Sequence, residues 1–508
     1  WEYFFIPDVW QALSPSNLTP WVSLSFDFDV FLFGVNPFGF YLHHIISLAA
    51  VAVATFFLLS LWMERPWAFL GSLLFIVGAP VETVAHQLMT RHYVEGLFFS
   101  ILVVYFFFYY SKTNKYRYIF VSLIFYAAAI SAKEIYVPLV IVLIFIQREN
   151  LFHYFKRTLP SVLPFVVIVA LYVIWRGHML SSIVGGYAGS SDYFSFAYWA
   201  LVLANFRKIP FLLAGGAHLL FISLFLVLTS AFFFAYKNKI ALGLLCFLLV
   251  LLPLSPLAKY PGITSPDRYL LLVWYFCSIS FVYFVAHRAS LSKKALCVVV
   301  PACGLMFMIV FSHTQAVAEN LDRIALESDV QMRFAWDHDQ RFAFVPTNII
   351  VSSFWTLTGL YDIKTFLNNG ASSPGVIVDD MFLQQEKKLF EYDADCRCMQ
   401  NIADQVSQRM IHAKRRVREH APLTLDIRNK NGIITWKLGP HGTGLYRLVS
   451  QTAGSIVLPA TGSLRTNITE PISFYLRYVS PEGWTTYSPL VTLSANGAPV
   501  QWARIDQK

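Results

Sequence analysis

Charged residues are scarce in this chain of 508 residues, at 14% of the total, and cysteine occurs only six times. Soluble globular domains carry roughly a quarter charged residues, so much of this chain requires a non-aqueous environment. The low charge excludes a disordered chain, and the low cysteine content excludes a small disulfide-stapled scaffold. Hydrophobic residues make up 56%, with 46 Phe, 26 Tyr and 13 Trp. A polytopic membrane protein is therefore the first expectation.

The charge is unevenly distributed along the chain. Residues 1–312 hold 19 Lys and Arg against 11 Asp and Glu, whereas residues 313–508 hold 20 against 19. We therefore predict four regions: a first external loop (1–38), an α-helical transmembrane domain (39–312), an external mixed α/β region (313–421) and a β-sandwich (422–508). No Met opens the chain, and we expect one further membrane span before Trp1.

About ten apolar runs can cross a bilayer, which takes about 20 helical residues. They lie near 39–62, 67–81, 93–111, 117–132, 135–147, 159–175, 210–236, 240–258, 269–286 and 295–312. Twelve of the cations before residue 313 fall in alternate loops, and Lys and Arg are retained in the cytoplasm. The remaining seven, among them Arg91, Lys133, Arg176 and Arg268, then lie on the external face together with residues 1–38 and the C-terminal regions.

Several polar motifs occur in a fixed order on this external face. They are Asn36-Pro37-Phe38-Gly39-Phe40, Pro80-Val81-Glu82 with Thr90-Arg91-His92, Ser131-Ala132-Lys133-Glu134, Trp175-Arg176, and Asp267-Arg268-Tyr269-Leu270. The set resembles the GT-C superfamily of polytopic glycosyltransferases over residues 18 to about 290. The nearest likeness is to the transmembrane O-mannosyltransferases, with protein O-mannosyltransferases and lipid A aminoarabinose transferases more distant.

The resemblance implies inverting transfer of a hexose or pentose from a polyprenyl-phosphate carrier to a hydroxyl group. Such transfer needs a carboxylate that takes the acceptor's proton, and cations that stabilise the departing phosphate. The family commonly has an adjacent acid pair in the first external loop, which this sequence lacks. Asp29, Glu2 and Glu82 are therefore the catalytic candidates. An alternative role for Asp29 is to cap a helix or to pair with an external arginine.

The same resemblance places Lys133 and Arg268 at the donor phosphate, with Arg176, Arg91 and His86 as further donor-binding candidates. Arginine suits phosphate through paired hydrogen bonds, whereas lysine acts as a point charge. The alternative is a structural ion pair between neighbouring spans, because each cation stands beside an acid. Glu82 and His86 are four residues apart and share a face if that loop is helical.

The C-terminal regions show different patterns. We expect a helix over 313–335, strands over 342–345, 349–351 and 375–378, and a helical stretch over 383–420 that ends in a basic run. From 422 onward, short alternating strands at 424–428, 432–437, 444–450, 472–479 and 486–493 resemble a fibronectin type III module around Trp436. Cys396 and Cys398 are expected to form a local disulfide rather than a metal site.

The leading hypothesis is a membrane glycosyltransferase acting on a protein or glycolipid on the periplasmic or lumenal face. The expected location is a bacterial inner membrane, with the C-terminal domain in the periplasm. A non-catalytic GT-C-like scaffold subunit of a larger membrane complex is the alternative, and a transporter is disfavoured. No cofactor and no metal site are assigned, a role for a divalent cation stays open, and nucleic acid is not expected as a partner.

Overall fold

The computed structural model describes the following residues: 2–14, 17–145, 151–183, 209–217, 268–289, 293–337, 343–344, 376–377, 388–418, 421–430, 433–450, 454–465, 472–493 and 500–501. The chain divides into two compact units, Trp1–Ala318 and Glu319–Lys508. Each unit has its own core, so each is described by itself.

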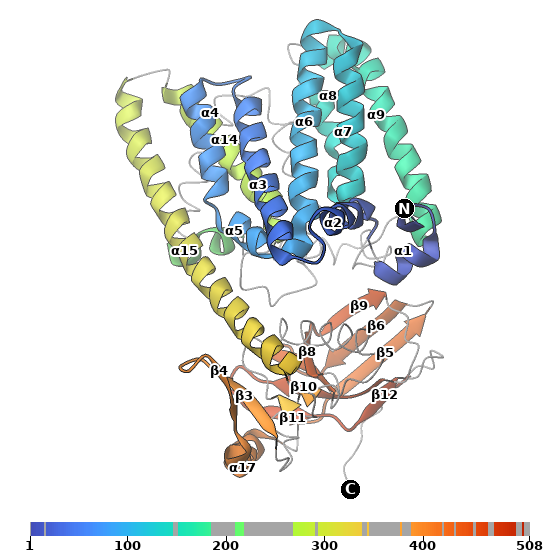
Figure 1. The fold of residues 1–508 in the computed structure, drawn as a ribbon, viewed down its shortest axis with the longest axis vertical. Helices are drawn as coiled ribbons and strands as arrows, with labels where there is room; N and C mark the ends of the chain where they lie inside the picture. Colours follow the sequence, from blue (N-terminus) through green and yellow to red (C-terminus); the bar gives the residue numbers. More distant parts are fainter. Residues whose placement is uncertain are drawn as a thin grey trace. The chain divides into compact units, whose positions relative to one another are not determined.

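The first unit is helical throughout its described part, with the long helices side by side (Figure 1). Its elements are η1 (Glu2–Phe4), α1 (Pro7–Leu13), α2 (Pro20–Phe33), α3 (Pro37–Leu59), α4 (Arg65–Ile76), α5 (Ala79–His86), η2 (Leu88–Thr90), α6 (Arg91–Thr113), α7 (Tyr116–Ala132), η3 (Glu134–Tyr136), α8 (Leu139–Phe145), α9 (Leu151–Leu180), α11 (Ile209–Ala214), η5 (Gly215–Ala217), η8 (Arg268–Leu270), α14 (Leu271–Ala289) and α15 (Lys293–Asp337). The last helix runs without a break through the expected boundary at residue 312.

Three helical segments in the described part are long and apolar enough to cross a membrane: Pro37–Leu59, Leu88–Thr113 and Pro160–Leu180. Helices α4 and α5 form a fourth if they are counted as one span, bent by 56°. Shorter apolar helices lie at Tyr116–Ala132, Glu134–Leu143 and Arg268–Tyr283. These helices support a location in a membrane. The expected run 240–258 and most of 210–236 lie outside the described residues.

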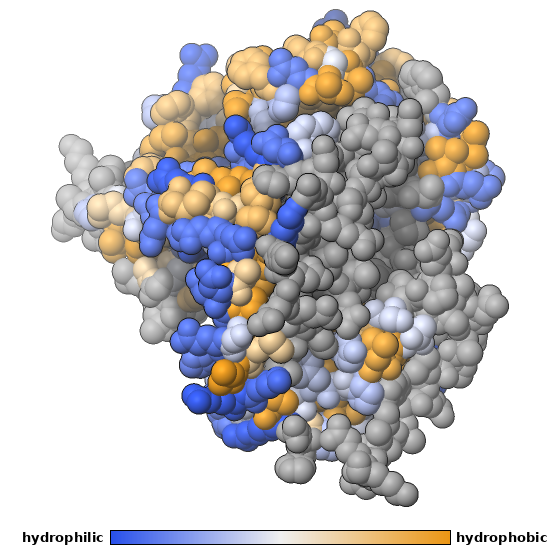
Figure 2. Space-filling view, turned by 60° about the horizontal axis from the view of Figure 1, so that its bottom comes forward, coloured by the Kyte–Doolittle hydropathy of each residue, from blue (hydrophilic) through white to orange (hydrophobic). Residues whose placement is uncertain are grey.

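Large hydrophobic side chains lie on the surface of the first unit as well as in its interior. Phe38 is 70% exposed and Ile174 is 70% exposed, both on candidate spans. Figure 2 shows such hydrophobic patches among hydrophilic side chains on one face of the molecule. Because apolar surface of this kind is costly in water, it agrees with helices that face lipid.

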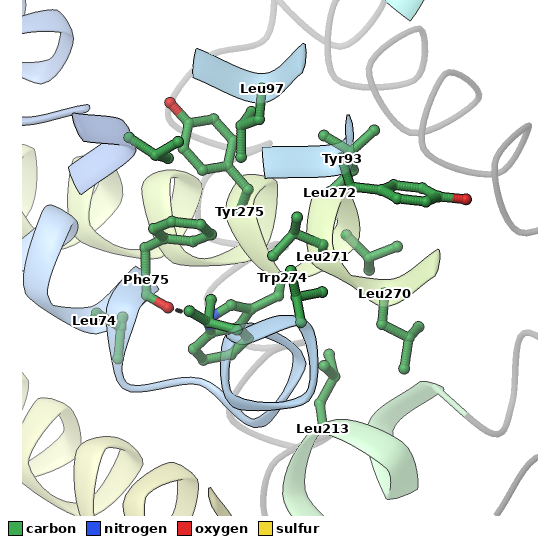
Figure 3. Packing of buried hydrophobic residues seen from close by; sticks show 14 of the residues in the cluster. Leu74, Phe75, Tyr93, Leu97, Leu213, Leu270, Leu271, Leu272, Trp274 and Tyr275 are labelled. Carbon is green, nitrogen blue, oxygen red and sulfur yellow. Dashed lines mark hydrogen bonds between the residues drawn. The ribbon is translucent and has the colours of Figure 1, made fainter. Parts of the chain in front are cut away.

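Two hydrophobic clusters hold the first unit together. The larger joins α3 to α6 with η8, α14 and α15, and the smaller joins α1, α6, α7, α8 and α9. In the larger cluster the Trp274 indole donates a hydrogen bond of 2.8 Å to the Phe75 carbonyl, and the Phe75 and Tyr275 rings meet edge to face (Figure 3). Helices α6 and α7 contribute to both clusters and so connect the two halves of the described bundle.

The described residues of the second unit form three sheets. The smallest has the order β2-β1-β3-β4 and is formed by β1 (Ala343–Phe344), β2 (Val376–Ile377), β3 (Leu389–Asp393) and β4 (Cys398–Asn401). Helix α17 (Val406–Arg416) follows it. Residues 389–401 thus form a hairpin where the sequence analysis expected helix, so that expectation was wrong. The Asp393 carboxylate accepts the N–H groups of Asp395 and Cys396, which fixes the turn, and Cys396 is disulfide-bonded to Cys398 as expected.

The other two sheets are antiparallel and share one hydrophobic core. One has the order β13-β5-β6-β9; the other has the order β11-β10-β7-β8, with β12 also paired to β10. Their strands are β5 (Thr424–Lys430), β6 (Ile433–Gly439), β7 (Leu445–Ser450), β8 (Gly454–Leu458), β9 (Thr461–Arg465), β10 (Ile472–Val479), β11 (Thr485–Tyr487), β12 (Val491–Leu493) and β13 (Val500–Gln501). Ile427 from the first sheet and Phe474 from the second lie in that core. The strands expected at 424–428, 432–437, 444–450 and 472–479 are present, and the one expected at 486–493 is divided into β11 and β12. Strands β8, β9 and β13 were missed.

Candidate functional site

The polar residues of the first unit gather around the first turn of α6. Helix α2 ends at Gly34, whose φ of 62° is readily adopted only by a residue without a side chain. The Asn36 side chain then accepts the Phe38 N–H and Pro37 occupies the first position of α3, so a new helix starts at once. This tight connection folds α2 back against the beginning of α3 and α6.

The first group of charged residues is centred on an ion pair between Asp29 of α2 and Arg91 of α6. Both side chains are fully buried. The Arg91 guanidinium also donates to the Phe40 carbonyl at 2.7 Å and to the Ser25 hydroxyl at 3.3 Å, and it lies 4.6 Å from the centre of the Phe26 ring. Asp29 is thus the partner of an external arginine, the alternative role given for it above, and it does not cap a helix.

His43 connects this pair to a second buried acid. Its Nδ1 lies 2.6 Å from an Asp29 carboxylate oxygen, and its Nε2 lies 3.5 Å from a Glu95 carboxylate oxygen. Glu95 also accepts hydrogen bonds of 2.8 Å from the Ser25 hydroxyl and the Trp21 indole. His43 thus bridges the two acids, and its contacts close the group around Asp29.

The second group is rich in positive charge. Lys133 lies between α7 and η3, with its ammonium 5.1 Å from the centre of the Tyr93 ring. Arg176 of α9 is buried and forms an ion pair with Glu134, which also accepts the Leu18 N–H at 2.7 Å. Arg268 of η8 stacks on Tyr269, whose ring meets that of Tyr93 edge to face. Three cations from distant parts of the sequence therefore lie close enough for the charges of Arg176 and Arg268 to act on Lys133.

Burial, together with the charges of Arg268 and Arg176, lowers the pKa of Lys133 to about 7, from an ordinary value of 10.5. An anion placed beside Lys133 would offset both effects and favour its charged form. The His92 side chain also experiences the charges of Lys133 and Arg268. The arrangement can therefore attract a phosphate group, while Arg176 forms the structural ion pair with Glu134 that the alternative role predicted.

The two groups lie on different sides of the same helical turn. Arg91 and Glu95 are four residues apart and share one face of α6, towards α2 and α3. Tyr93 points to another face, where its ring contacts Lys133 and its carbonyl accepts the Tyr136 hydroxyl at 2.5 Å. Contacts within the described residues thus bring Asp29 and Arg91 together and, separately, Lys133, Arg176 and Arg268.

Glu82 and His86 share one face of α5, as expected from their spacing. The His86 Nδ1 lies 3.0 Å from the Glu82 carbonyl and 3.5 Å from its carboxylate, and about a third of each side chain is exposed. Helix α5 packs against η8, which carries Arg268. Glu82 is therefore an accessible carboxylate on an element adjacent to the cationic group.

Glu2 is exposed on η1, and no contact within the described residues links its carboxylate to either group. Its neighbour Tyr3 donates a hydrogen bond of 2.7 Å to Asp27. The three catalytic candidates therefore differ. Asp29 is buried in an ion pair with Arg91, and Glu2 has no contact with either charged group within the described residues. Glu82 is partly exposed and lies on a helix that packs against η8, which carries Arg268.

The opposite end of the helical bundle carries a different set of cations. Arg65 begins α4, Lys112 lies in the last turn of α6, and Lys115 and Arg117 lie where α7 starts. Contact between the Trp62 and Phe108 rings confirms that the end of α3 and the end of α6 meet there. The cations assigned to the cytoplasm and those assigned to the external face therefore occupy opposite ends of the described helices.

Sequence reasoning missed His43 and Glu95 as members of the site. The available signal was their position: each is ionisable and lies within an apolar helix, where such residues are costly and tend to have a role. No group of metal-ligating side chains occurs within the described residues.

The sequence and the structure were also compared with known proteins. No family model, no curated protein and no solved structure matches this chain.

Proposed function

We propose that this protein is a membrane glycosyltransferase of the GT-C type, which transfers a sugar from a polyprenyl-phosphate donor to a protein or glycolipid. The observation that carries the proposal is the group formed by Lys133, Arg176 and Arg268. Three cations that lie close together at the end of an apolar bundle favour binding of a lipid-linked phosphate. The acceptor face is the periplasmic or lumenal one, because the retained cations occupy the other end.

We assign a role to each residue from the exposure and the charge of its side chain. Lys133 and Arg268 contact the donor phosphate and stabilise it as it leaves, while Arg176 holds Glu134 in place. Glu82 takes the proton of the acceptor hydroxyl as it attacks C1 of the sugar, with His86 beside it. Asp29, Arg91 and His43 fix α2 and α3 against α6 and so position the site without touching the substrate.

We also propose that the fold has about ten spans of GT-C type, followed by a fibronectin type III-like module. The two sandwich sheets support the module, since both are antiparallel and pack around one hydrophobic core. Trp436 lies on β6, with its indole donating to the Pro459 carbonyl at 2.9 Å. A bacterial inner membrane remains the proposed location.

The test is transfer of a radiolabelled sugar from a polyprenyl-phosphate donor in membranes that contain Lys133→Ala or Arg268→Ala protein. Each change is expected to lower the rate about 100- to 1,000-fold, the cost of removing one group that stabilises a developing negative charge. Removal of Lys133 relieves repulsion from Arg176 and Arg268, so the fold should persist. Lys115→Ala, at the exposed opposite end, is the matched control. Full activity in both site variants would refute the proposal.

A second candidate is a non-catalytic GT-C-like scaffold subunit, and the sealed state of Asp29 favours it. A scaffold needs Lys133 and Arg268 only for lipid binding or packing. It therefore predicts no transfer by the wild-type protein with any lipid-linked sugar, together with co-purification of other membrane subunits.

A further inference from the structure

The second unit carries an exposed disulfide in the tight turn between β3 and β4. Cys396 and Cys398 are joined across a single intervening residue, with their Cα atoms 5.3 Å apart. Cys396 and Arg397 are exposed and Cys398 is partly exposed, so the bond lies at the surface of this unit. The proposed transferase chemistry makes no use of these residues.

A crosslink over so short a loop adds little to the stability of a fold. A disulfide stabilises a protein largely by restricting the unfolded chain, and this restriction grows with the number of residues in the closed loop. Crosslinks that support a fold therefore gain most when they join segments far apart in the sequence. Cys396 and Cys398 are only two positions apart, so we expect their bond to contribute little to the free energy of unfolding.

The hairpin does not rest on the disulfide alone. The Asp393 carboxylate accepts the N–H of Asp395 at 2.7 Å and the N–H of Cys396 at 3.3 Å, which holds the turn from within. Strands β3 and β4 are paired along four residues of each strand. Leu389 and Tyr392 of β3 are buried. The hairpin therefore keeps its own hydrogen bonds and its buried side chains when the two sulfurs are reduced.

The surroundings of the sulfurs suit exchange with an external thiol. The Gln400 side chain donates a hydrogen bond of 3.6 Å to Cys396 Sγ, and such a donor stabilises a thiolate more than a neutral sulfur. Arg397 attracts an incoming thiolate, whereas Asp393 and Asp395 repel it. Since these charges oppose one another, exposure of Cys396 and the Gln400 hydrogen bond are the features that favour exchange.

We propose that the Cys396–Cys398 disulfide is an exchange site for small thiols and not a structural crosslink. A thiolate attacks the exposed Cys396 sulfur, forms a mixed disulfide with it and releases Cys398 as a thiolate. A second thiolate attacks the small thiol's sulfur in that mixed disulfide, so Cys396 leaves as a thiolate and the two small thiols leave joined as a disulfide. The protons that the small thiols lost return to the two cysteines. The protein disulfide is thereby reduced and the small thiols are oxidised, independently of any transferase activity.

The first test places the full-length protein, in detergent, in glutathione buffers of increasing reducing strength and then traps free thiols with an alkylating agent. Mass spectrometry of the peptide that contains both cysteines measures the reduced fraction. We expect reduction by millimolar glutathione in the folded protein, because exposed, labile disulfides are reduced more readily than structural ones. The melting temperature should be nearly the same before and after reduction.

Two results of this test would overturn the proposal. One is a disulfide that stays oxidised until the protein unfolds. The other is a large fall in melting temperature on reduction, which would make the bond a structural crosslink. Neither result bears on sugar transfer, so the proposed function is tested separately.

A second test asks which sulfur exchanges. Cys398→Ser leaves Cys396 as a free thiol, and Cys396→Ser is the matched variant that leaves the less exposed Cys398. Oxidised glutathione should add one glutathione to Cys396, the reverse of the second step, and should do so faster than to Cys398. Faster modification of Cys398 would contradict attack at Cys396. Gln400→Leu in the Cys398→Ser background should slow the addition, since it removes the donor to Cys396 Sγ.

Discussion

The two charged groups on either side of the first turn of α6 use similar residues with opposite consequences. At Asp29 and Arg91, one acid balances one cation, both side chains are fully buried, and hydrogen bonds enclose the pair. Around Lys133, burial and the nearby charges of Arg268 and Arg176 lower the pKa of the lysine. A balanced buried group stabilises one arrangement of helices, whereas an unbalanced group has lower energy when an anion joins it. Charge balance, more than the presence of charge, separates structure from binding here.

Arg91→Ala is expected to have the largest effect, and it tests whether the Asp29–Arg91 group is structural. It leaves Asp29 as a buried carboxylate with its main partner removed, which costs about 3 to 5 kcal/mol when a buried ion pair is broken. We expect a large fall in thermal stability in detergent and low yield. The double variant Asp29→Asn with Arg91→Met should recover much of the loss, because no unpaired charge then remains. A single variant as stable as the wild type would show that the balanced group is not structural.

A smaller effect is expected from Gly96→Ala, which tests how closely the backbone of α6 approaches the turn that carries Lys133. A Cβ at position 96 would lie 2.3 Å from the Tyr136 ring, so the turn that carries Lys133 must shift. Overpacking of this kind costs about 1 to 3 kcal/mol. Sugar transfer should fall more than stability does.

The control for this change is Gly304→Ala in α15, where a Cβ would meet nothing within 4 Å. That variant should be neutral or slightly more stable, since alanine favours helix. Equal behaviour of the two variants in thermal unfolding and transfer assays would contradict the close approach at Gly96.

The smallest effect concerns pH and tests the unbalanced group directly. Lys133 is charged below its pKa of about 7 and loses its proton as the pH rises. Affinity for a phosphodiester donor analogue, whose own charge is constant in this range, should therefore fall between pH 7 and pH 9. Binding above pH 7 should also take up a proton. Calorimetric titrations in buffers of different ionisation enthalpy measure both effects.

Lys133→Arg is the matched variant for the pH experiment, because arginine stays charged throughout. Its affinity should be nearly independent of pH over the same range. The same slope in Lys133→Arg and wild type would assign the pH dependence to another group.

The two units also differ in how much of their secondary structure could be predicted from the sequence. The apolar runs 39–62, 93–111 and 117–132 correspond closely to α3, α6 and α7, because burial in lipid requires helical backbone whatever the neighbours are. The hairpin at 389–401 was missed, since its turn depends on Asp393 hydrogen bonds and a disulfide rather than on periodicity. Strand β8 was missed as well, and its partner β7 was needed to define it.

The sequence by itself determined an apolar helical bundle, a change to β structure after residue 422, and cations sorted between two ends. Each follows from local composition, which acts through hydropathy and backbone preference. Only the tertiary structure decided that Asp29 pairs with Arg91 and is sealed, that His43 and Glu95 belong with them, and that Lys133, Arg176 and Arg268 meet. The energies of those charges depend on burial and on neighbours up to 135 residues away along the chain (Lys133 to Arg268), which no local pattern encodes.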